Sequence, residues 1–315
     1  MILAFALQIL QITIVIAVAP LVLGITRKVR ARLLRRRGAP LLQVYLDIWK
    51  LMHKEAVLAH NASWVYRGAP YLVFAATWVA AGLVPTYATG LLFSWSADLI
   101  AIVALLGTAR FALALAGMDV GTAFGGIGSS REMMIASLAE PAMLLIAFTV
   151  ALIAGTTQLS AIATIFVHAE TGLRVSLGLA LLALVVVGVA ENARIPVDNP
   201  ATHLELTMVH EAMVLEYSGR HLAMIEAAAA VKLVLYFSLI ACLFFPFGIA
   251  TGDAAATVML GIGSFLFKMV LFAVVLPIAE TSVAKMRVFR YPAFLGGAFA
   301  AAALAVFLRF VSRGF

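Results

Sequence analysis

The sequence predicts an all-α integral membrane protein with about eight transmembrane helices and one amphipathic helix on the inner membrane surface. Of the 315 residues, 64% are hydrophobic and only 12% are charged, about half the charged fraction of a soluble domain. The apolar residues also form windows of the length that a helix needs to cross a bilayer core about 30 Å thick. We therefore expect a single polytopic membrane domain, residues 1–315.

The apolar windows give the order of the spans. They cover residues 2–25, 70–93, 97–117, 134–155, 174–190, 222–248, 255–279 and 291–311. The fifth window is the shortest, and the fourth carries Glu140-Pro141 near its start. The first window has no basic residue before it, and the cluster RKVRARLLRRR follows it. This order predicts a first span rather than a signal peptide.

The basic residues predict the orientation. Ten of the 22 lysines and arginines lie between Arg27 and Arg67. The other expected inner loops hold Arg110, Arg131, Arg194, Arg220, Lys285, Arg287 and Arg290, whereas the outer loops and the tail hold Arg174, Arg309 and Arg313. The positive-inside rule then places residues 27–67 in the cytoplasm and both termini outside, as in a multi-pass protein of a bacterial inner membrane. The net charge of +7 follows from this topology and does not indicate nucleic acid.

Residues 38–58, between the first two spans, predict an amphipathic helix on the membrane surface. Leu42, Leu46, Trp49 and His53 recur at helical spacing, and charged residues occupy the other faces. The apolar run is too short and too charged to span. The segment is either a surface anchor or a platform for a cytoplasmic partner, and its pattern does not decide between them.

Several ionisable residues lie inside or beside the spans. A charge at bilayer depth costs about 2.5–3.5 kcal/mol and by default indicates a functional site. These residues are Glu140, Glu226, Lys232 and Lys268, with Glu191 and Glu280 near inner span ends. Each of them alone can be explained as a helix-pairing charge; for the whole set we favour a buried proton relay.

The segment 191–219 predicts a carboxylate-rich cytoplasmic loop that leads into a helix. It contains Glu191, Asp198, Glu205, Glu211 and Glu216, and prolines interrupt its first part. Glu205 and Glu216 are eleven residues apart and share a face if the segment stays helical. Residues 121–130, GTAFGGIGSS, precede a span and lack a phosphate-loop lysine, so we expect a flexible inner loop.

The sequence predicts no metal site and no redox centre in this chain. Cys242 is the only cysteine, which leaves neither a disulfide nor a cysteine-ligated cluster. His203 and His210 are seven residues apart, which is not a zinc-ligand spacing.

These motifs resemble a known family. GAPLLQVYLDIWKLMHKE is similar to the first inner loop of the complex I membrane subunit beside the quinone site, and AENARIPVD is similar to its long inner loop. Glu205-Leu206, Glu216-Tyr217-Ser218 and the combination of Arg131 with Glu140 also match. Ala201, His203 and three extra residues in the loop depart from complex I. The string IPVDNPATHLELTMVHEAMVLEYSG instead resembles the membrane subunit of group 4 NiFe hydrogenases, of the formate hydrogenlyase and hydrogenase-4 type.

The resemblance implies a membrane anchor that binds the hydrogenase large and small subunits, iron–sulfur subunits and antiporter-like membrane subunits. The NiFe centre and the iron–sulfur clusters would belong to these partners, and the altered loop argues against a retained quinone site. The resemblance and the buried charges together imply ion-coupling candidates, which are Glu140, Glu191, Glu205, Glu211, Glu216, Glu226, Lys232, Lys268 and Glu280. The residues implied in docking and loop structure are Gln43, Asp47, Lys50, Lys54, Glu55, Arg131, Arg194 and Asp198.

Two other functions stay open at this point. The chain could be the quinone-site subunit of a complex I-type dehydrogenase, which its first inner loop resembles. It could also be a standalone secondary transporter that uses the buried charges, although it shows no inverted repeat with paired broken helices.

Overall fold

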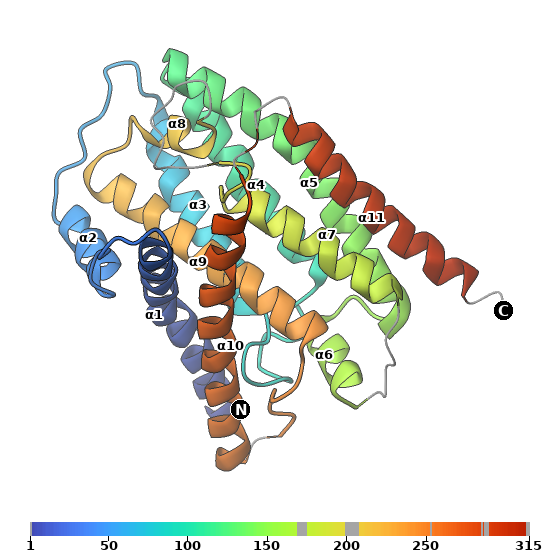
Figure 1. Ribbon diagram of the computed structural model, residues 1–315. Coiled ribbons are helices and arrows are strands. Elements are labelled where there is room, and N and C mark those ends of the chain that lie inside the picture. The colour runs from blue at the N-terminus through green and yellow to red at the C-terminus, as the bar shows by residue number, and fades with distance from the viewer. Residues whose placement is uncertain are drawn as a thin grey trace.

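The computed structural model describes residues 2–168, 175–198, 208–252, 254–284, 286 and 290–312. In these ranges the chain forms eleven α-helices and no β-strand, apart from two isolated bridges (Figure 1). The all-α membrane fold expected from the sequence is thus confirmed.

Eight of these helices overlie the eight apolar windows. They are α1 (Ile2–Leu33), α3 (Trp64–Leu83), α4 (Leu99–Asp119), α5 (Ala123–Ala154), α7 (Val175–Glu191), α9 (Gly219–Phe244), α10 (Ala255–Ser282) and α11 (Tyr291–Val311). Six are long and apolar enough to cross a membrane, and α7 is a shorter apolar helix of 17 residues. Helix α3 has 20 residues but begins with the polar stretch around Arg67, which shortens its apolar run.

Two boundary predictions were wrong, and both have local causes. The second window was expected to reach residue 93, but α3 ends at Leu83 because Val84 precedes Pro85 and is extended. Residues 123–130 were expected to be a loop, but they are the first turns of α5. Thr122 caps this helix by accepting a hydrogen bond from the Gly125 amide.

The glycines of this stretch allow close packing rather than flexibility. A Cβ on Gly125 would lie 2.1 Å from the Gly117 carbonyl oxygen, and one on Gly128 would lie 3.0 Å from the Val209 oxygen. Because no side chain intervenes, α4, α5 and the chain before α8 approach one another closely.

The remaining helices are short. Helix α2 (Gln43–Met52) lies within the expected amphipathic segment; it buries Val44 and exposes Leu42, Leu46 and Trp49. Helix α6 (Leu159–His168) was not expected from the sequence, and α8 (His210–Val214) is a single short helix in the carboxylate-rich loop.

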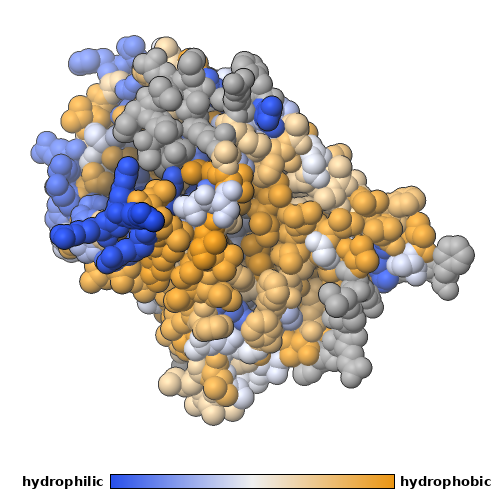
Figure 2. All heavy atoms as spheres, viewed as in Figure 1, coloured by the Kyte–Doolittle hydropathy of each residue, from blue (hydrophilic) through white to orange (hydrophobic). Residues whose placement is uncertain are grey.

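The two ends of the bundle differ in chemistry. We call one the basic end; it is formed by residues 27–67, 119–123, 191–198, 208–221 and 280–284. Hydrophilic side chains gather there over α2 and the end of α1, whereas apolar side chains cover the spans (Figure 2). At the opposite end, backbone hydrogen bonds join the loops, from Ala250 to Tyr87 at 2.8 Å and from Leu159 to Ala97 at 2.9 Å. The cavity described next therefore lies at the basic end.

Candidate functional site

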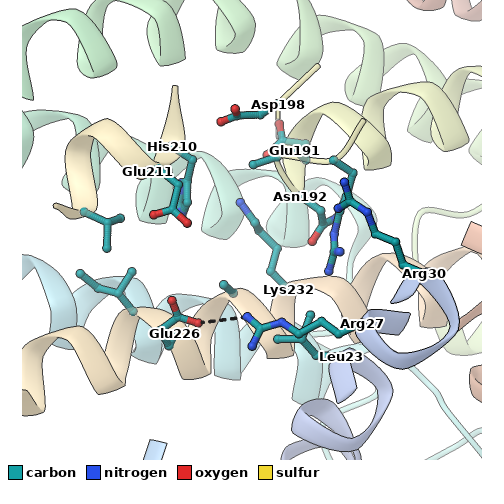
Figure 3. Close-up of a pocket in the computed structure, with 15 residues that line it drawn as sticks. Leu23, Arg27, Arg30, Glu191, Asn192, Asp198, His210, Glu211, Glu226 and Lys232 are labelled. Atoms are coloured by element: carbon teal, nitrogen blue, oxygen red, sulfur yellow. Dashed lines mark ion pairs between the residues drawn. The ribbon is translucent and has the colours of Figure 1, made fainter. Parts of the chain in front are cut away.

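A cavity of about 160 Å³ lies at the basic end, between α1, α8, α9 and the segment that follows α7 (Figure 3). Nine of the 15 residues around it are ionisable, namely Arg27, Arg30, Glu191, Arg194, Asp198, His210, Glu211, Glu226 and Lys232. Four of the ion-coupling candidates, Glu191, Glu211, Glu226 and Lys232, thus surround one cavity, although they come from separate segments of the sequence.

A buried arginine connects this cavity to the interior of the bundle. The guanidinium of Arg110, in α4, forms an ion pair with Glu191 at the end of α7. It also lies 3.4 Å from a carboxylate oxygen of Glu140 and 3.6 Å from one of Glu132, both in α5. Arg110 was expected in an inner loop, and that expectation is wrong: it is buried within a span.

Glu140 is therefore not an unpaired carboxylate. It faces α4 at Gly107, where a Cβ would lie 3.3 Å from the Glu140 oxygen. Its side chain is nevertheless 43% exposed, whereas that of Glu191 is 3% exposed. The network of Arg110, Glu132, Glu140 and Glu191 thus runs from the cavity wall to the outer surface of the chain between α4 and α5.

Glu280 belongs to a second ion-pair group on the other side of the cavity. Its carboxylate is buried in α10 and lies 3.9 Å from the guanidinium of Arg30 and 3.7 Å from that of Arg194. Glu226, in α9, pairs with Arg27 at 3.8 Å. Two arginines of α1, Arg27 and Arg30, therefore pair with carboxylates of two other spans, α9 and α10.

The carboxylate-rich loop is held by one hydrogen bond from α5 and one within the loop itself. Arg131 donates a hydrogen bond to the Met208 carbonyl at 2.7 Å, and the buried Asp198 carboxylate accepts one from the Val209 amide at 3.2 Å. Arg131 and Asp198, assigned to docking and loop structure, thus hold the loop itself.

The end of the loop joins the segment that follows α2. Ser218 Oγ accepts a hydrogen bond from the Val57 amide at 2.8 Å and donates one to its carbonyl at 3.1 Å. The Tyr217 ring stacks on Tyr66 with 4.1 Å between ring centroids. Burial raises the pKa of Tyr217 and keeps its hydroxyl protonated. The two sequence stretches that carry the family resemblance therefore form one surface.

Two of the other coupling candidates, Glu216 and Lys268, lie apart from the cavity and from the ion pairs described above. Glu205 lies outside the described residues. Glu216 is exposed in the turn between α8 and α9. Residues 208 and 209 are not helical either, so no continuous helix leads from position 205 to Glu216. Lys268, in α10, donates hydrogen bonds to the carbonyls of Phe245 and Phe247 at 2.7 and 2.5 Å. These hydrogen bonds satisfy backbone carbonyls at and just after the carboxyl-terminal end of α9.

The docking candidates of α2 lie on a neighbouring face. Gln43 donates a hydrogen bond to Asp47 at 2.8 Å, Lys50 and Lys54 line a groove beside α1 and α9, and Glu55 is exposed. None of these side chains reaches the 160 Å³ cavity.

Sequence reasoning missed Glu132, Arg110 and His210. Arg110 is a lone charge in an apolar window, and the rule that selected Glu140 would have selected it too. His210 lies at the cavity in α8; burial first, and then the positive charge of Lys232, lower its pKa to about 4. It is therefore a neutral hydrogen-bonding group at neutral pH. His203, seven residues earlier in the sequence, lies outside the described residues.

The described residues contain no group of three or more His, Cys, Asp or Glu side chains placed to hold a metal ion. Cys242 is buried in α9. What the cavity and the Arg110 network offer is a set of neighbouring acids and bases, open to the basic end, that can bind water and exchange protons.

The fold and the site define a multi-pass membrane subunit with a charged cavity. Residues 5–311 match the family model described as NADH dehydrogenase. The chain is 33% identical to formate hydrogenlyase subunit 4 of Escherichia coli over 96% of both chains. It is 34% identical to hydrogenase-4 component C of the same organism, over 88% of this chain and 87% of the relative. The chain belongs to the NADH dehydrogenase subunit 1 family.

More distant relatives agree with this assignment. NADH-quinone oxidoreductase subunit 8 of Rhodothermus marinus is 29% identical over 66% of this chain and 61% of its own length. A chain of the membrane-bound sulfane sulfur reductase, an archaeal respiratory membrane complex, has the same fold, with a TM-score of 0.79 and 20% identity over 97% of this chain and 99% of that one. The protein is thus a membrane component of an oxidoreductase complex.

Proposed function

We propose that this chain anchors the soluble redox subunits of a membrane-bound NiFe hydrogenase and couples their electron transfer to ion movement across a bacterial inner membrane. The observation that carries the proposal is the continuous ionisable network from the basic end, through Glu191 and Arg110, to Glu140 within the spans. The similarity to formate hydrogenlyase subunit 4 and hydrogenase-4 component C supports the hydrogenase branch.

The charge balance of the network supports ion coupling. Glu132, Glu140 and Glu191 all lie beside the guanidinium of Arg110, and Lys232 lies near Glu132 and lines the cavity with Glu191. Acids and bases that neighbour one another within membrane spans are typical of proton pathways. Moving one charge across 100 mV takes about 2.3 kcal/mol, so a change in charge next to the cavity at each turnover is energetically relevant.

The basic end supports docking of the soluble subunits. The segment after α2 and the 216–219 turn are hydrogen-bonded into one surface there, beside the cavity. We infer that this surface contacts the hydrogenase large and small subunits, which with the iron–sulfur subunits carry the NiFe centre and the clusters. With this contact in the cytoplasm, both termini lie outside.

Glu140 supports a second partner. A carboxylate that is 43% exposed within a membrane span is costly against lipid, so we infer that the face between α4 and α5 is covered by an antiporter-like membrane subunit.

The proposal is tested by neutralising the network without changing its shape. Glu191→Gln and Glu140→Gln are made in the intact complex, which is reconstituted in vesicles at matched subunit content. We expect hydrogen evolution to continue and ion movement per hydrogen to fall. Arg36→Gln, which removes an exposed charge outside the cavity and the network, is the control. Normal ion movement in both network variants would make these carboxylates structural.

A further inference from the structure

A second open space lies between α2 and the bundle. It measures about 300 Å³ and is lined by α2 on one side and by α1 and α9 on the other. Its charged lining residues are Arg27, Asp47, Lys50, Lys54 and Glu226. This groove is separate from the Arg110 network, and none of the proton chemistry proposed above uses its lysines.

The charges of the groove are unequally paired. Glu226 is held by Arg27 at 3.8 Å, and Asp47 accepts a hydrogen bond from Gln43 at 2.8 Å. Lys50 and Lys54 form no ion pair with any residue in the described ranges. Lys50 lies in the last turn of α2 and Lys54 lies two residues after its end, and both line the groove.

The position of α2 places this groove at the membrane surface. The helix buries Val44 toward the bundle and turns Leu42, Leu46 and Trp49 outward, with exposed fractions of 59%, 58% and 68%. An amphipathic helix with an outward apolar face lies in the interface between headgroups and acyl chains, where tryptophan is enriched. The two lysines are therefore at the depth of lipid phosphates, and the apolar Ile48 and Leu51 line the same groove.

We propose that the groove between α2, α1 and α9 is a binding site for the phosphate headgroup of an anionic phospholipid. Lys50 and Lys54 pair with the phosphate, and Ile48 and Leu51, which line the same groove, contact the first part of the acyl chains. Basic groups at the inner surface recognise anionic lipids in this way. The bound lipid fills the space between α2 and the spans and holds α2 beside the docking surface.

The test measures lipid retained by the intact complex. The complex is placed in nanodiscs of phosphatidylglycerol with phosphatidylcholine, extracted in mild detergent and weighed by native mass spectrometry. Lys50→Gln with Lys54→Gln should weaken retention of phosphatidylglycerol by roughly thirtyfold, since each interfacial lysine contributes about fivefold to binding of anionic lipid. Arg36→Gln with Arg37→Gln removes the same charge at exposed positions away from the groove and should have little effect. Equal losses in both double variants, or none in the first, would overturn the site.

A second arm separates lipid from free phosphate. Added inorganic phosphate should not displace the retained lipid, because it lacks acyl chains; displacement at equal concentration would point to a soluble anion and overturn the lipid assignment. A photoreactive phosphatidylglycerol should label residues 43–54 of the unmodified chain. This experiment needs no variant. Labelling only of residues outside 43–54 would also overturn the proposal.

Discussion

Arg110 of α4 and Glu191 of α7 form a buried ion pair at the wall of the basic-end cavity. The same guanidinium is the nearest cation to Glu132 and Glu140, so one side chain neutralises carboxylates from two other helices. This arrangement makes Arg110 a structural requirement and a part of the proposed proton path at once. Substitutions that separate the two roles are therefore informative.

Replacing Arg110 should cost stability. Removing one partner of a buried ion pair typically destabilises by about 3–5 kcal/mol, because an uncompensated charge is left behind. We expect Arg110→Gln to lower the yield and the thermal midpoint of the complex strongly. Arg110→Lys keeps the charge but loses the planar fork that reaches three carboxylates, and should be intermediate. Unfolding is followed by fluorescence-detected size exclusion after heating, and a wild-type midpoint for Arg110→Gln would contradict the ion-pair assignment.

Gly107 tests the position of Glu140. A Cβ at residue 107 would lie 3.3 Å from the Glu140 oxygen, tight enough to move the carboxylate away from Arg110. We expect Gly107→Ala to reduce ion movement while assembly and hydrogen evolution persist. Gly178→Ala is the matched control: it also replaces a helical glycine, and nothing lies within 4 Å of its Cβ. That control should be neutral or stabilise by up to about 1 kcal/mol.

Much of the fold could be predicted from the sequence, because a bilayer requires long apolar helices and hydropathy records them directly. Assembly of the site could be predicted only in part. Glu191, Glu226 and Lys232 were selected as intramembrane charges, but hydropathy carries no information on which helix faces which. That Arg110 joins three carboxylates and that Lys268 caps α9 depend on helix packing. Residues 121–130 were wrongly predicted to be a flexible loop for the same reason, since glycines that allow close packing and glycines that give flexibility look alike in sequence.

The contact between the segment after α2 and the 216–219 turn should depend on Gly219. This residue has φ +52°, and its Cβ would lie 2.3 Å from the Glu55 carbonyl oxygen. We expect Gly219→Ala to separate the segment after α2 from the 216–219 turn and to increase protease cleavage near residues 53–61. Gly90 has φ +71° with nothing within 4 Å of its Cβ, so Gly90→Ala carries only the backbone strain, about 1–2 kcal/mol. Equal protection in both variants would mean that contact with Glu55 does not hold this surface together.

Orientation is tested by labelling. In a background with Cys242 replaced by serine, Arg35→Cys should react with a membrane-impermeant maleimide only from the cytoplasm, and Thr251→Cys only from outside. Both positions are exposed, at opposite ends of the bundle. The excess of basic residues at the Arg35 end is the physical reason. Labelling of position 35 from outside would reverse the topology and the docking proposal together.

His210 should make the basic end sensitive to acid. Burial lowers the pKa of His210 to about 4, whereas an unfolded histidine titrates near 6.5. Above pH 6.5 both states are neutral and the residue has no pH-dependent effect. As the pH falls below 6.5, the histidine of the unfolded state takes up a proton, whereas that of the folded state stays neutral until the pH nears 4. The free energy of unfolding therefore falls over this range by about 3 kcal/mol in total, of which roughly 2 kcal/mol is lost by pH 5.

The measurement is the thermal midpoint of the complex between pH 7.5 and pH 5. His210→Gln keeps a hydrogen-bonding side chain but cannot titrate, and should flatten the acid-side decline. His60→Gln replaces an exposed histidine and should leave the decline unchanged. Because all other titrating groups are the same in the three proteins, the difference between the two variants isolates the buried imidazole. A decline in His210→Gln as steep as in the wild type would show that the imidazole of His210 is hydrated in the folded state.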